Sequence, residues 1–106
     1  QMTYLTIDND KARLLLGELS VYNLIIIGVN PSYATDKISD LTITKVKHFS
    51  KANNFNGWLM INIYPQRSTD PLKLHDKYLL NPINILIVTM CFYFINLWLL
   101  NYYIIK

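Results

Sequence analysis

The sequence has a single cysteine, Cys91, which excludes both an internal disulfide framework and a cysteine-rich zinc site. It also lacks a Walker loop, a dinucleotide-binding glycine fingerprint, a nucleophile elbow and the paired-histidine motif of zinc proteases. Its two histidines, His48 and His75, have no second histidine or cysteine at a metal-ligand spacing. The sequence therefore predicts neither a metal site nor a cofactor.

Residues 78–105 contain no charged residue, and they include seven of the fourteen aromatic side chains. Residues 1–77 hold all seven acidic residues and nine of the ten lysines and arginines. This contrast predicts two segments: an incomplete α/β domain over residues 1–77 and an uncharged apolar tail over residues 78–106.

The remaining composition is that of a folded protein. Of the 106 residues, 52% are apolar and only 16% are charged, so global disorder is excluded and one domain is expected. The formal net charge of +3 permits a partner that carries phosphate without requiring one.

Several short segments have the apolar patterning of secondary structure. Residues 23–29 and 58–63 are apolar runs typical of strands that are buried on both faces, as in a parallel sheet. The expected elements are a strand at 3–7, a strand or helix at 12–19, a strand at 23–29, a helix at 38–52 capped by Ser39 or Asp40, a strand at 58–63 and a helix that begins at Asp70-Pro71.

The order strand, helix, strand with short connections predicts a right-handed βαβ unit. The expected fold class is α/β: a partial, truncated three-layer fold with a small parallel sheet, followed by an apolar C-terminal helix. Ligands of such sheets bind beyond the carboxyl ends of the strands. Two polar loops, 30–37 and 64–70, are expected there.

Five residues at these loops and strand ends are the candidate ligand-binding residues: Asn30, Ser32, Asn62, Arg67 and Asp70. Asn30 can hold a water or read a base edge, and Arg67 can bind a phosphate. Asn62 lies within an apolar run, where a buried amide needs a partner or a ligand. The alternatives stay open: Asn30 and Ser32 as plain turn residues, Asn62 as a satisfied core amide, and Arg67 as the ion-pair partner of Asp36, Asp40 or Asp70.

The apolar segment 83–105 is long enough to cross a bilayer, with Lys77 and Lys106 on either side. In that interpretation it tethers the chain to a membrane with the N-terminal domain in the cytoplasm. Two alternatives compete with it: a core helix plus a strand of the domain itself, or a tail produced by a shifted reading frame.

Three ordered blocks resemble a bacterial and phage family known as domain of unknown function 1643, over about residues 20–76. The first block is IIIGVNPSYATD, with Asn30, Pro31, Ser32 and Ala34 at the family positions. The second supplies Asp40, Thr42 and Ile43, and the third supplies Gly57, Asn62, Tyr64, Arg67, Thr69, Asp70 and Pro71. Thr35 stands where the family pattern has an acidic residue.

A more distant resemblance is to the uracil-DNA glycosylase superfamily, through the turn Gly28-Val29-Asn30-Pro31 and the strand 57–62. The resemblance implies that Asn30 positions an attacking water and that Asn62 binds the amide edge of a flipped pyrimidine. The superfamily's late His-Pro-Ser loop has no counterpart in the sequence.

The sequence thus predicts a domain that binds a nucleotide or a nucleic-acid base at loops 30–37 and 64–70. An N-glycosidase reaction is the only enzymatic class that it indicates, and Asn30 is the only catalytic candidate. The alternatives are a small protein anchored in a membrane through 83–105 and an inactive truncated fragment. The oligomeric state is left open.

Overall fold

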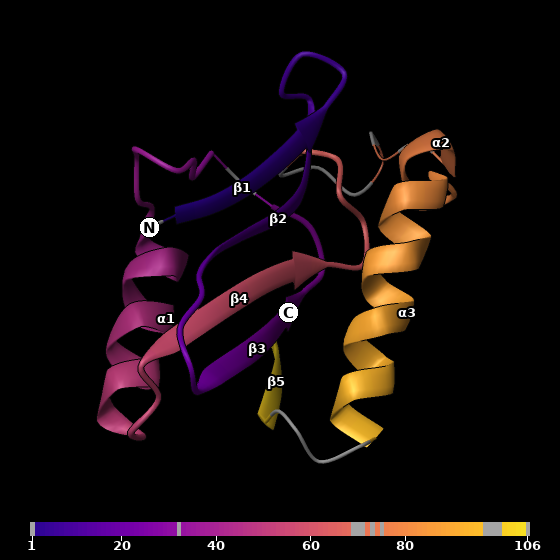
Figure 1. The fold of residues 1–106 in the computed structure, drawn as a ribbon. Helices are drawn as coiled ribbons and strands as arrows, with labels where there is room; N and C mark the ends of the chain where they lie inside the picture. Colours follow the sequence, from indigo (N-terminus) through magenta and orange to yellow (C-terminus); the bar gives the residue numbers. More distant parts are fainter. Residues whose placement is uncertain are drawn as a thin grey trace.

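The computed structural model describes residues 2–31, 33–68, 72, 74, 76–96 and 101–105 (Figure 1). It is an α/β structure, as the sequence predicts, but the expected small parallel sheet is a mixed sheet, because two of its strand pairs are antiparallel. Its elements in chain order are β1 (Met2–Ile7), β2 (Ala12–Glu18), β3 (Asn23–Gly28), α1 (Leu41–Ala52), β4 (Gly57–Asn62), α2 (Asp76–Leu79), α3 (Pro82–Asn96) and β5 (Asn101–Ile105).

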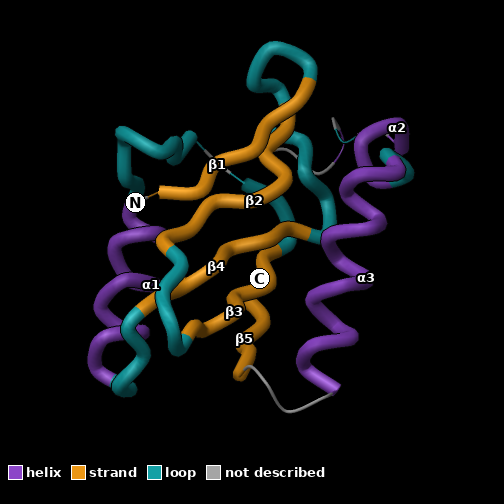
Figure 2. Tube along the Cα trace, in the orientation of Figure 1, coloured by secondary structure: helices purple, strands orange, loops and turns teal. Residues whose placement is uncertain are grey.

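The strands form a five-stranded sheet in the order β1-β2-β4-β3-β5 (Figure 2). β3 and β4 pair in parallel and are joined through α1, so the predicted βαβ unit is present. β2 is antiparallel to β4 and to β1, and β5 adds to the free edge of β3 in parallel. The sequence pattern of residues 12–19 is compatible with a strand or a helix. In the structure this segment forms a strand, β2.

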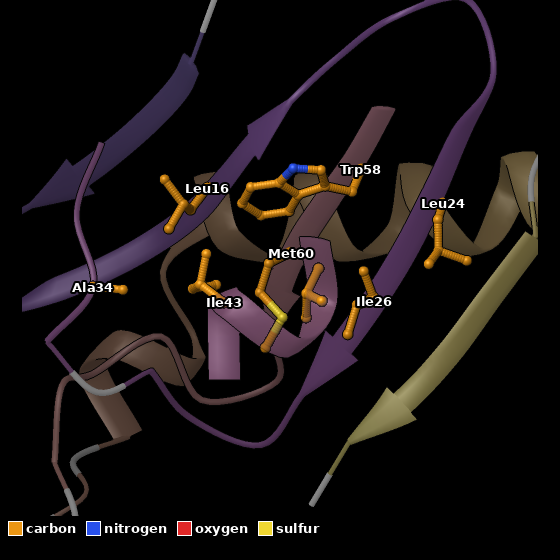
Figure 3. Packing of buried hydrophobic residues seen from close by; sticks show 8 residues of the cluster. Leu16, Leu24, Ile26, Ala34, Ile43, Trp58 and Met60 are labelled. Atoms are coloured by element: carbon orange, nitrogen blue, oxygen red, sulfur yellow. The ribbon is translucent and has the colours of Figure 1, made fainter. Parts of the chain in front are cut away.

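Helices cover both faces of the sheet, with α1 on one face and α3 on the other (Figure 1). Alternate residues of β3 and β4 point to opposite faces. Leu24, Ile26, Trp58 and Met60 pack with Ile43 of α1, as Figure 3 shows. Ile25, Ile27 and Ile61 pack with Cys91 of α3. Both strands are thus buried on two faces, which explains their unbroken apolar sequence.

Helix α1 begins at Leu41, three residues later than the expected start at residue 38. The reason is a tight turn, in which the Thr35 hydroxyl accepts from the main-chain N–H groups of Lys37 and Ile38. Asp40 is the N-cap, and its carboxylate accepts from the N–H of Ile43 at 2.8 Å. The helix start expected at Asp70-Pro71 lies outside the described residues, and α2 begins at Asp76.

The prediction of one membrane-spanning helix over 83–105 is wrong. The structure divides this segment into α3, which ends at Asn96, and β5, which pairs with β3. Among the described residues, no helix has the length and apolar character needed to cross a membrane. Ile87, Val88 and Cys91 of α3 pack on the sheet, so this part of the tail is apolar because it covers the domain's own core. The observed arrangement is the helix-plus-strand alternative.

We expect Asp40→Ala to lower the free energy of unfolding by about 1 kcal/mol, because the first turn of α1 loses its side-chain acceptor. Asp40→Asn keeps an acceptor and should lose clearly less, as measured by urea denaturation. An equal loss in both variants would show that the charge of Asp40, not its capping bond, is what stabilises the domain.

Candidate functional site

The predicted loops meet at the carboxyl end of β3 and β4. The parallel pairing continues past both strands, since the N–H of Ile63 donates to Gly28 at 2.9 Å and that of Tyr64 donates to Val29 at 2.7 Å. Loops 30–37 and 64–68 therefore start side by side. The geometry that the βαβ unit predicts for this edge is present in the structure.

Asn62 ends β4 with a fully buried side chain, 0% exposed. Its register partner on β3 is Gly28. A Cβ atom on residue 28 would lie 2.7 Å from Asn62 Nδ2 and 2.6 Å from Met60 Cε. Glycine at position 28 is thus what leaves room for the Asn62 amide beneath the loops.

The Asn62 amide is only half satisfied. Its Oδ1 accepts a long hydrogen bond of 3.4 Å from Arg13 Nη2. Its Nδ2 is buried and has no hydrogen-bond partner among the described residues. Because Arg13 can only donate, this bond fixes the amide orientation and leaves its N–H groups directed elsewhere.

Arg13 is the residue of this site that the sequence reasoning missed. It lies on β2 with a side chain only 2% exposed, and its Nη1 donates to the carbonyl of Ala34 in loop 30–37 at 3.1 Å. Its Nε has no hydrogen-bond partner within the described part of the chain. Burial lowers the pKa of Arg13 to about 10, with a smaller lowering by the nearby Arg67, so it remains charged at neutral pH.

An irregularity in the β1–β2 pairing gives Arg13 this position. Leu5 pairs with Leu15, but the next residue, Thr6, pairs with Arg13, so the register shifts at this point. Leu15 packs toward the α3 face, whereas Arg13 contacts Ala34 and Asn62 on the α1 side. A β-bulge re-aims side chains in this way and is common near functional sites.

Arg67 reaches the same carbonyl from the second loop. Its Nη1 donates to Ala34 O at 3.1 Å, and its Nε donates to Asp10 O at 3.0 Å. Its Nη2 donates to the Tyr4 hydroxyl at 2.6 Å and forms an ion pair of 3.5 Å with Asp10. The Tyr4 hydroxyl in turn donates to Asp10, and this bond holds the pKa of the Asp10 carboxyl below its ordinary value. Arg67 therefore links three segments: the β1–β2 turn, loop 30–37 and its own loop.

Asn30 joins the two loops directly, because its amide nitrogen donates to the main-chain carbonyl of Ser68. Its side chain is partly buried. The structure thus places Asn30, Asn62 and Arg67 at one end of the sheet. Ser32 and Asp70, the other two predicted ligand-binding residues, lie outside the described residues.

A surface pocket of about 420 Å³ adjoins Arg67 and is lined by Lys11, Gln66, Lys77 and Tyr78 besides Arg67. Lys77 forms an ion pair of 3.6 Å with Asp8, which also accepts a hydrogen bond from Tyr78. The charged groups at this end of the sheet include the cations Lys11, Arg13, Arg67 and Lys77 and the carboxylates Asp8 and Asp10, which pair with Lys77 and Arg67. Within the described residues, no three His, Cys, Asp or Glu side chains group to hold a metal ion.

We expect Gly28→Ala to lower the free energy of unfolding by roughly 1–3 kcal/mol, because Asn62 and Met60 must both move away from the new methyl group. Urea denaturation measures this loss. The loss should shrink when Asn62→Ala is added, because one of the two clashes is then removed. An unchanged loss in the double variant would contradict the close approach of Gly28 and Asn62.

Comparison with known proteins yields one family. The family model described as "Protein of unknown function (DUF1643)" matches residues 13–93. No curated protein and no solved structure matches the chain. The matched range extends beyond the expected 20–76 at both ends: it begins at Arg13 and includes most of α3. The chain belongs to the family of proteins of unknown function DUF1643.

Proposed function

We propose that the chain binds a nucleotide or a nucleic-acid base at the carboxyl end of β3 and β4, with loops 30–37 and 64–70 around the ligand. One observation carries the proposal. The Nδ2 group of Asn62 is a buried donor without a hydrogen-bond partner among the described residues, at the edge where ligands of parallel sheets bind.

A buried amide donor without a partner costs about 1–3 kcal/mol of stability. Such groups are uncommon in folded proteins and often belong to functional sites. A ligand with a hydrogen-bond acceptor would satisfy Asn62 and recover this free energy in the complex. Nucleic-acid bases and phosphates are rich in acceptors, which supports a nucleotide or a base as the ligand.

The other residues support this assignment through their positions. Asn30 bonds to the Ser68 carbonyl and Arg67 bonds to the Ala34 carbonyl, so each loop is tied to the other. A ligand above Asn62 would thus meet loops that are already fixed relative to each other, which lowers the entropy cost of binding. Ser32 and Asp70 enter the proposal from the sequence pattern alone.

An N-glycosidase reaction stays a prediction that rests on the resemblance to uracil-DNA glycosylases. In that reaction Asn30 would hold the attacking water. Since its amide nitrogen donates to Ser68, the side-chain oxygen is the atom that would accept from this water. Release of free uracil from a uracil-containing oligonucleotide would test the prediction separately from binding.

The test of binding is Asn62→Leu, titrated by calorimetry with the four ribonucleosides, their 5′-monophosphates and a mixed-sequence single-stranded oligonucleotide. We expect the affinity for the ligand that binds the wild-type chain to fall at least about tenfold, the equivalent of one hydrogen bond of about 1.4 kcal/mol. The free energy of unfolding should change by less than about 1 kcal/mol, since the removal of an unpaired buried donor offsets the loss of the weak acceptor of Arg13 Nη2.

Asn84 provides the matched control. It is another buried amide, 2% exposed, with an oxygen that has no partner among the described residues, but it lies on α3 outside the proposed site. Asn84→Leu should leave ligand affinity unchanged. A large loss of stability in Asn62→Leu, or an equal loss of affinity in both variants, would assign Asn62 to the core instead.

A further inference from the structure

Arg13 has fewer partners than its burial demands. Its guanidinium has five N–H donors, and the structure gives it two acceptors, Ala34 O at 3.1 Å and Asn62 Oδ1 at 3.4 Å. Nε is buried without a hydrogen-bond partner among the described residues. Arginine is almost never fully buried unless it is paired.

Neither ion pair found within the described residues includes Arg13, since they join Arg67 to Asp10 and Lys77 to Asp8. Asp40 attracts Arg13, but one of its carboxylate oxygens caps α1 at Ile43. Arg67, a second guanidinium, donates to the same Ala34 carbonyl and repels Arg13. Two cations therefore converge on one neutral oxygen.

Arg13 Nε and Asn62 Nδ2, the buried donors that lack a hydrogen-bond partner in the part of the chain that the structure describes, belong to side chains that are hydrogen-bonded to each other. Both can only donate from these atoms, so the group that satisfies them must be an acceptor. The positive charge of Arg13 favours an anionic acceptor over a neutral carbonyl. Among the acceptors of a nucleotide, this selects the phosphate.

We propose that the ligand of this site carries a phosphate group whose oxygens are bound by Arg13 Nε and Asn62 Nδ2. This inference rests on the proposed function and names the ligand group that Asn62 binds. Arg67 lies on the second loop at the same carbonyl and adds positive charge beside the phosphate. The base then lies farther out, between the loops.

The test compares each ribonucleoside with its 5′-monophosphate by calorimetry on the full chain. For the wild-type chain we expect the monophosphate to bind at least about tenfold more tightly than the nucleoside, as charge-assisted bonds to arginine require. In Arg13→Met this ratio should fall several-fold, to the smaller preference that Asn62 and Arg67 still provide. Methionine fills much of the space of the arginine stem, so the buried charge is removed without a large void.

Lys51→Met is the matched control. Lys51 lies in the last turn of α1, is exposed, and carries the same charge as Arg13 without a buried donor or a place in the proposed site. It should keep most of the wild-type ratio. If Arg13→Met does not fold, Arg13→Lys replaces it with the same expected fall, since lysine keeps the charge but lacks the Nε donor.

The outcomes separate the two proposals. Equal binding of nucleoside and monophosphate to the wild-type chain would overturn the phosphate assignment and leave the proposed function in place. No binding of any nucleoside, nucleotide or oligonucleotide would overturn both. A ratio that is unchanged in the Arg13 variant, or that falls equally in Lys51→Met, would show that general surface charge and not the buried pair selects the phosphate.

Discussion

The buried guanidinium of Arg13 is the constraint on which this end of the molecule depends. It joins β2 to loop 30–37 through the Ala34 carbonyl and to β4 through Asn62, all on the α1 face of the sheet. Arg67 binds the same carbonyl from the other loop. The Ala34 carbonyl therefore links both loops to β2, and the bond from Asn30 to the Ser68 carbonyl joins the loops a second time.

This arrangement lowers the stability of a small domain. A buried charge that forms no ion pair within the described residues, and two buried donors without a hydrogen-bond partner in that part of the chain, reduce stability, whereas an apolar replacement of similar volume would often increase it. Proteins commonly violate the rules of good packing at functional sites and compensate elsewhere. The compensation lies in the apolar layers that α1 and α3 form on the two faces of the sheet. Because the buried polar groups lower stability, we favour a binding role for the Arg13–Asn62 pair over a purely structural one.

Much of the fold could be predicted from the sequence because its signals are local. The unbroken apolar runs of β3 and β4 and the helical period of α1 identify the parallel βαβ unit, and this unit places Asn30 and Asn62 at one edge. Arg13 could not be found in this way. A charged residue in a strand is expected to face solvent, and the sequence gives no sign of the register shift between Leu5 and Thr6 that accompanies the position of Arg13 on the α1 face. The structure of the apolar segment 83–105 could not be predicted either. An uncharged run of this length fits a bilayer as well as it fits a helix and an edge strand that cover one sheet.

Binding of a phosphate by the Arg13–Asn62 pair is tested most directly by the side-chain NMR signals of both residues during titration with a nucleoside 5′-monophosphate. We expect the NH₂ resonances of Asn62 and the Nε–H resonance of Arg13 to shift together and to saturate with the ligand, while the NH₂ resonances of Asn84 stay in place. If ligand binds and shifts other resonances while Asn62 and Arg13 do not respond, the binding site lies elsewhere and the proposed role of the pair is wrong.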